Sequence, residues 1–163
     1  VLPYESIVIS LYYTMKSYNL SNTYWSLILP QIGLSIPFSI FWLRASFKAI
    51  PKSLSEAAMI EGAGRFTILI KILIPQMIPA ILTLTVLLFM WTWNEFLLAL
   101  IMIQDADMRT APLALSYFAG NKRYGDPAIT AAAAIWVALP VLIIYIILQR
   151  RFISGMVTGA VKE

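Results

Sequence analysis

Long apolar segments separated by short polar ones dominate this chain. A transmembrane helix needs about 20 mainly apolar residues, and three segments meet that length, at residues 24–43, 79–103 and 127–149. A fourth apolar stretch, within residues 1–18, is shorter between its flanking charges, and we interpret it as part of a further span. The pattern predicts an all-α fold, a polytopic transmembrane helical bundle.

The basic residues are distributed unevenly between these spans. Five Lys or Arg residues lie between the first two long spans and three lie in the C-terminal tail, against four on the opposite side. Cytoplasmic loops of membrane proteins retain Lys and Arg. We therefore expect residues 51–75 and the C-terminus to be cytoplasmic, and residues 104–126 to form an extracytoplasmic loop.

Composition narrows the class of protein further. The chain has 163 residues, of which 60% are hydrophobic and 12% charged, whereas a soluble domain has about 45–50% apolar and about 25% charged residues. It contains no Cys and no His, which excludes a Cys/His zinc site, a thiolate nucleophile and an imidazole base. We therefore expect no catalytic or metal site. The net charge of +4 is attributed to membrane topology rather than to nucleic-acid binding.

The chain opens on Val1 in the middle of an apolar region, without a charged leader. We expect it to be the C-terminal portion of a longer, N-terminally truncated protein, with its earlier spans missing.

The most informative polar segment, residues 51–75, begins with a helix-start signal. Ser53 is followed three residues later by Glu56, which forms a capping box. In a capping box the Ser side chain accepts a backbone N–H and the Glu side chain reaches back to the cap residue. A short helix is therefore predicted to begin at Ser53.

A bend and a second helix are predicted to follow. Gly62, Ala63 and Gly64 form a small-residue stretch, and glycine can adopt the positive φ that turns a chain out of a helix. A second helical stretch begins at Arg65, and we expect Pro75 to end it, because its ring cannot continue a helix.

The first of these helices has the composition of a docking element. Ala57 and Ala58 leave a face poor in side-chain atoms, and Glu56 and Glu61 place acidic groups beside it. Such a surface fits a groove on another protein. An amphipathic connector that lies at the lipid headgroups is the alternative.

A spaced pattern runs through the same segment. Its members, in order, are Glu56, Ala57, Ala58, Gly62, Ile72, Ile74 and Pro75. The pattern resembles the EAA motif of the inner-membrane permease subunits of binding-protein-dependent ABC importers. That family has Leu where this chain has Ile74, and usually Asp where it has Glu61.

The resemblance extends over essentially the whole chain. It includes shorter motifs at residues 22–25, 50–54, 93–96, 109–113, 139–140, 149–152 and 159–162. These motifs resemble the carbohydrate-uptake branch of the family, and within it the maltose-type second permease. Members of this family have further spans before those seen here.

The resemblance implies a role and partners. The segment that begins at Ser53 would be a coupling helix, held in a cleft of an ATPase subunit. Glu56 would pair with a basic residue of that ATPase, and Gly62 would permit the bend. ATP and Mg would be bound by the ATPase, so this chain needs no cofactor of its own. The other implied partners are a second permease and an extracytoplasmic solute-binding protein.

Two further regions have competing interpretations. Glu95 is the only acidic residue deep in a long apolar span, with Asn94 next to it and Trp93 just before. These residues lie either at the outer membrane interface or along a translocation path. Residues 104–126 form either a solvated surface loop or, as the resemblance implies, a contact with the solute-binding protein.

The sequence thus predicts a non-catalytic, multi-pass permease subunit of an ATP-driven importer, for a sugar or related solute, in a bacterial or archaeal cell membrane. Importers of amino acids, peptides or ions are an alternative, because they also carry EAA loops. An ion-coupled carrier is a more remote one.

Overall fold

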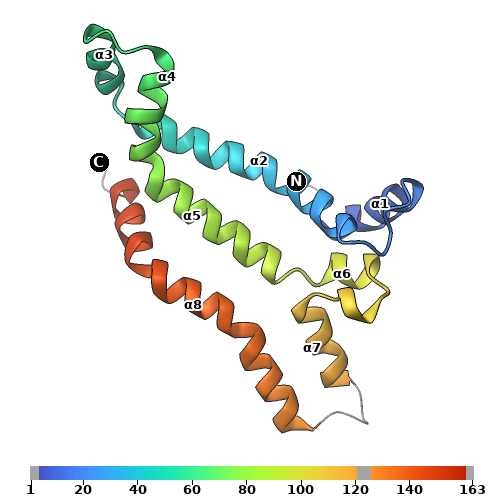
Figure 1. Ribbon diagram of the computed structural model, residues 1–163. Coiled ribbons are helices and arrows are strands. Elements are labelled where there is room, and N and C mark those ends of the chain that lie inside the picture. Colours follow the sequence, from blue (N-terminus) through green and yellow to red (C-terminus); the bar gives the residue numbers. More distant parts are fainter. Residues whose placement is uncertain (1–3, 121–125, 161–163) are drawn as a thin grey trace. The chain divides into compact units, whose positions relative to one another are not determined.

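A computed structural model describes residues 4–120 and 126–160, and the side chains of these residues up to position 147 with the exception of Gly120. All regular structure in this part of the chain is helical, which confirms the predicted all-α class (Figure 1). The elements are α1 (Tyr4–Ser17), α2 (Trp25–Ala49), α3 (Lys52–Ile60), α4 (Arg65–Ile68), a π-helical turn (Leu69–Leu73), α5 (Ile74–Trp93), α6 (Leu97–Met102), a 3-10 turn (Ala106–Met108), α7 (Ala111–Gly120) and α8 (Pro127–Ala160).

Three helical stretches are long and apolar enough to cross a membrane, namely Trp25–Ala49, Arg65–Trp93 and Pro127–Ile147. Two of them overlap the spans predicted at residues 24–43 and 127–149. The predicted span 79–103 differs, because its helix starts earlier and stops at Trp93, and the remaining apolar residues form the separate helix α6. The N-terminal stretch forms α1, which has only 14 residues.

The expectation that Pro75 ends a helix is wrong. α4, the π-helical turn and α5 follow one another without interruption, and Pro75 is the second residue of α5. A proline lacks an N–H, and its ring clashes with the carbonyl four residues earlier. The π-helical turn ends at Leu73, two residues before Pro75. In a π-helix each backbone N–H bonds the carbonyl five residues earlier instead of four, which widens the turn. The widened turn accommodates the proline, so the helix continues.

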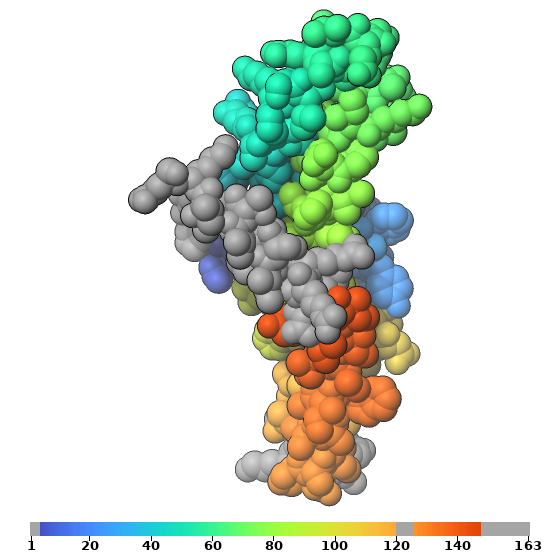
Figure 2. Space-filling view, turned by 90° about the vertical axis from the view of Figure 1, so that its left-hand side faces the viewer, coloured from blue at the N-terminus to red at the C-terminus, as the bar shows by residue number. Residues whose placement is uncertain are grey.

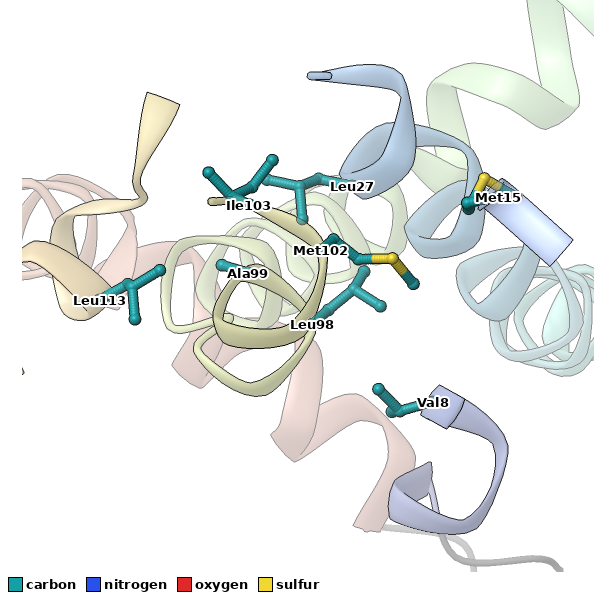
Figure 3. Packing of buried hydrophobic residues seen from close by; sticks show 8 residues of the cluster. All are labelled: Val8, Met15, Leu27, Leu98, Ala99, Met102, Ile103 and Leu113. Atoms are coloured by element: carbon teal, nitrogen blue, oxygen red, sulfur yellow. The ribbon is translucent and has the colours of Figure 1, made fainter. Parts of the chain in front are cut away.

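The chain divides into two compact units. The first unit comprises residues 1–34 and 89–145, and its core surrounds α6. Leu98 and Ala99 are fully buried and Met102 is nearly so. Figure 3 shows them among side chains from α1, α2 and the segments that follow α6, which are Val8, Met15, Leu27, Ile103 and Leu113.

The second unit comprises residues 35–88 and 146–163. The Trp42 indole N–H donates to the carbonyl of Ala80 at 3.0 Å and so joins α2 to α5. α3 packs beside α4, as Figure 2 also shows, where α3 is teal and α4 green. Ala58 of α3 and Ile68 of α4 are buried in this unit.

Candidate functional site

The bend between α3 and α4 is a hydrogen-bonded turn built around Gly62. We call residues 51–68 the elbow. Gly62 has φ +82°, which confirms the positive φ expected there. The Ala63 N–H donates to the Ala58 carbonyl at 2.9 Å, and the Gly62 N–H donates to the Met59 carbonyl at 3.0 Å. These two bonds form a Schellman motif, which satisfies the last carbonyls of a helix. The elbow is therefore a defined turn rather than a loose loop.

The capping box predicted at the start of the first helix is not formed. α3 begins at Lys52, one residue before Ser53, and its N-cap residue is Pro51. No side chain caps this end. Pro51 has an extended backbone with φ −59° and ψ 130° and leads directly into the helix, so Ser53 lies inside the first turn. A Ser at that position cannot accept the N–H groups that a true N-cap accepts. Ser53 and Glu56 are both exposed.

The two alanines of the elbow do not share one open face. Ala58 is buried inside the elbow, whereas Ala57 is exposed. Successive helical residues point in directions about 100° apart, because a turn contains 3.6 residues. Only Ala57 therefore contributes to the open surface, next to the exposed carboxylates Glu56 and Glu61. Ala63 is half-buried after the turn.

Two large apolar side chains flank the Gly62 turn, and the sequence interpretation missed both. Ile60 is 87% exposed and Phe66 is 75% exposed. Phe41 and Trp136, within two of the membrane-length stretches, are 72% and 74% exposed, and lipid can cover such side chains there. Phe66 lies at the start of the stretch Arg65–Trp93, whereas Ile60 lies outside all three stretches. An available signal was the position of Ile60 directly before the residues of a predicted turn, where little of the chain can cover it. Pro75 lies further on, in α5, and takes no part in the elbow.

The second candidate region is the break between α5 and α6. α5 ends at Trp93, and α6 begins at Leu97. Glu95 lies in the break and makes contacts with both its side chain and its backbone. Its Oε1 accepts the Leu98 N–H at 2.7 Å, and its carbonyl accepts the Thr110 hydroxyl at 3.2 Å. The break is therefore held by specific bonds.

The three neighbouring residues proposed for a translocation path have different surroundings. Trp93 is half-buried, stacks on Phe89 at 5.6 Å between ring centroids, and donates its indole N–H to the Val137 carbonyl at 2.9 Å. Asn94 is exposed and donates its amide to the carbonyl of Met90 at 2.8 Å. Glu95 is half-buried. Of the three, only Asn94 presents its side chain at the surface.

Residues 104–126 contain more regular structure than a solvated loop, namely the 3-10 turn and α7. Asn22 fixes the start of this segment, because its Oδ1 accepts the N–H groups of Gln104 and Asp105 at 2.9 and 3.0 Å. Further on, the Arg109 guanidinium lies 3.9 Å from the centre of the Tyr117 ring. Residues 121–125 lie outside the described residues, as do residues 161–163 of the tail.

The described residues contain no group of three or more His, Cys, Asp or Glu side chains that could hold a metal ion. Because the chain has no His and no Cys, neither the elbow nor the break holds an imidazole base or a thiolate nucleophile. What the two regions offer is an open polar–apolar surface at the elbow and an ordered interruption of an apolar helix at the break.

In a comparison with known protein families, one family model matches almost the whole chain. The profile described as "Binding-protein-dependent transport system inner membrane component" matches residues 1–158.

Individual relatives agree with this match. A trehalose transport system permease protein of Mycobacterium tuberculosis is 34% identical over 99% of this chain. A sulfoquinovosyl glycerol transport system permease protein of Agrobacterium fabrum is 35% identical over 98%, and a diacetylchitobiose uptake system permease protein of Streptomyces coelicolor is 34% identical over 98%. The chain spans 60%, 56% and 58% of these three relatives, respectively.

Proposed function

Because the chain belongs to the family of inner-membrane components of binding-protein-dependent transport systems, we propose that it is a membrane-spanning permease subunit of an ATP-driven carbohydrate importer. Three long apolar helices fit a multi-pass subunit. The carbohydrate class is supported by relatives whose names give trehalose, sulfoquinovosyl glycerol and diacetylchitobiose as what they transport or take up.

The elbow is the part of this chain that docks on an ATPase subunit. The observation that carries this assignment is the exposure of Ile60 beside the Gly62 turn and outside the three membrane-length stretches, with Phe66 exposed on the other side of the turn. Large apolar side chains left in water are unfavourable, and burying one fully is worth about 1.5–3 kcal/mol. Apolar residues surrounded by polar ones are typical of the centres of protein interfaces.

The acidic residues of the elbow fit the edge of the same interface. Glu56 and Glu61 are exposed on either side of Ile60 in the sequence. Glu56 pairs with a basic residue of the ATPase, where the charge steers association and fixes the orientation of docking. The ATPase binds and hydrolyses ATP with Mg, and closure of two such subunits moves the elbow and with it the spanning helices.

The remaining partners and the orientation follow from this assignment. The elbow and the C-terminus face the cytoplasm, as the distribution of Lys and Arg indicates. A second permease subunit covers part of the exposed apolar surface of the spans, since none of the most apolar window of Pro127–Ile147 is buried within this chain. Residues 104–126 face the solute-binding protein, and Asn94 lies on the translocation path.

Docking is tested by co-purification of the ATPase with the full-length subunit from membranes that contain the whole transporter. Ile60→Asp is expected to lower the recovered ATPase about tenfold or more, because truncating or charging an interface hot spot costs at least about 2 kcal/mol. The matched control is Gln76→Asp, which places the same charge on an exposed polar position of α5, outside the elbow, and should leave recovery unchanged. Equal recovery with Ile60→Asp and the unmodified subunit would contradict the docking assignment.

Substrate class is tested separately, by uptake of radiolabelled sugars into cells or proteoliposomes that contain the complete transporter. Uptake of a disaccharide that requires ATP is the expected result. ATP-dependent uptake of amino acids, peptides or ions and not of sugars would assign the importer to another branch.

A further inference from the structure

Glu95 occupies an unusual position, because this one residue bonds both the helix that follows it and a segment further along the first unit. Its side chain bonds the start of α6, and its backbone carbonyl bonds Thr110, which lies directly before α7. Glu95 is thus in contact with segments far apart in the sequence.

The break itself explains why such contacts are needed. The first N–H groups of any helix lack partners within that helix, and in apolar surroundings an unsatisfied N–H is costly. Phe96, at the N-cap position of α6, has no side-chain acceptor, and no side-chain cap is formed there. The Glu95 carboxylate, one residue earlier, satisfies the N–H of Leu98 instead.

The bonded N–H belongs to the centre of the core. Leu98 is 0% exposed and lies with Ala99 and Met102 in the cluster that joins α6 to α1, α2 and α7 (Figure 3). A hydrogen bond to an ionised group is roughly twice as strong as one between neutral groups. The Glu95 carboxylate therefore stabilises the first turn of α6, the helix around which the core of the first unit packs.

These contacts argue against a role for the carboxylate as a solute ligand. A group that contacts a passing solute must be free to exchange partners, whereas the Glu95 carboxylate is half-buried and already accepts a short bond from the backbone. We infer that Glu95 is a positioning residue. Its carboxylate fixes the first turn of α6 and its carbonyl fixes the segment at Thr110, so that the break after Trp93 keeps one shape and presents Asn94 at the surface.

This inference uses the proposed transport function only to state what the break is for. Its test does not use transport. The described chain has no cysteine, so a single cysteine at Met102, which is 1% exposed, is a local probe of α6. The full-length subunit is used within its complex, with any cysteine outside this chain replaced by serine, and its labelling rate by N-ethylmaleimide is measured.

In this background, Glu95→Ala is expected to raise the labelling rate of the cysteine at position 102 about tenfold or more, because the first turn of α6 loses its hydrogen bond to a charged group. Glu95→Gln keeps an acceptor oxygen at the same reach. It should restore protection to within about threefold of the unmodified residue, because a neutral bond is about half as strong.

Two controls separate positioning from general loosening. A cysteine at Met77, which is 2% exposed and belongs to the second unit, should keep its labelling rate in Glu95→Ala. Asp126→Ala removes another carboxylate that accepts a backbone N–H at a helix start, from Ala128 at 2.8 Å, and should leave the cysteine at position 102 protected.

If Glu95→Ala does not accumulate, Thr110→Val provides the same test, because it removes only the 3.2 Å bond to the Glu95 carbonyl. It should raise labelling at position 102 severalfold. Unchanged protection at position 102 in Glu95→Ala, or in Thr110→Val where the first is not obtained, would overturn the inference. So would an equal rise at positions 77 and 102. A failed sugar-uptake or docking experiment would leave this result unaffected.

Discussion

The elbow and the break before α6 both interrupt a helical course, yet they are held in opposite ways. At the elbow, the turn is formed by backbone bonds around Gly62, and its large side chains Ile60 and Phe66 are left exposed. At the break, Glu95 and Thr110 bond the chain, and one face of the adjoining helix α6, with Leu98, is buried. A turn that depends on its own backbone leaves its side chains available to a partner. A break that depends on neighbouring side chains uses those side chains to hold its own shape.

The largest loss of stability should come from substitutions in the buried core around α6. Leu98→Ala is expected to lower the free energy of unfolding by about 2–5 kcal/mol, because it leaves a cavity in the core around α6. Leu100→Ala makes the same chemical change on the same helix at a side chain that is 44% exposed, and it should cost far less. Equilibrium unfolding in mixed micelles of increasing dodecyl sulfate measures both. Equal losses would show that α6 is not the centre of the core.

A smaller but clear effect is expected at Asn22, which ties the segment after α6 to the start of α2. Its Oδ1 accepts two backbone N–H groups, and its own φ is 56°. Asn22→Ala removes the acceptor and also strains the backbone, so the loss should be about 1–3 kcal/mol. Asn22→Gly removes the acceptor alone and should cost less than alanine. The same unfolding measurement compares the two variants. A larger loss of stability with Asn22→Gly than with Asn22→Ala would contradict this account of Asn22.

At the exposed elbow, Gly62→Ala should destabilise the turn only by straining the backbone conformation at this position. A Cβ at Gly62 meets no atom within 4 Å, so no clash is involved. The positive φ costs a non-glycine residue roughly 1–2 kcal/mol, and hydrogen exchange of the Ala63 amide should become about fivefold faster or more.

Gly64→Ala is the matched control for this prediction. Gly64 also has open space around its Cβ position, but its φ is −69°, which any residue adopts. Exchange at Ala63 should be unchanged in Gly64→Ala. If both substitutions accelerated exchange equally, the turn would not depend on the conformation of Gly62.

The smallest effect is expected at Ser53. Because this residue does not cap α3, Ser53→Ala should change stability by no more than about 0.5 kcal/mol. A working capping box would lose about 1 kcal/mol. Hydrogen exchange of the first amides of α3 distinguishes the two cases, and a clear acceleration would restore the capping box that the sequence pattern predicts.

Local patterns explain which features could be predicted from the sequence. The long apolar runs, the helical class and the positive φ at Gly62 each depend on a few neighbouring residues, and each is present in the structure. The error at Ser53 is also local, since Pro51 starts the helix one residue earlier than the capping signal indicates.

Other features depend on partners that the sequence does not place together. The residues around Pro75 contain no sequence signal that predicts the π-helical turn, and this turn lets the helix continue. After the end of α5 at Trp93, the Glu95 carbonyl accepts a bond from Thr110, a residue 15 positions away in the sequence. The apolar run 79–103 therefore looks like one span, although it contains the end of one helix and the whole of another.

The central claim is that the exposed elbow contacts an ATPase subunit, and site-specific cross-linking tests it most directly. A cysteine at Ile60 in the full-length subunit would carry a photoactivatable cross-linker within the assembled transporter. A cysteine at Trp136, which is 74% exposed on the spanning helix α8, provides the comparison. The account predicts a cross-link to the ATPase from position 60 and none from position 136. Cross-links from position 60 only to lipid, or to no protein, would contradict it.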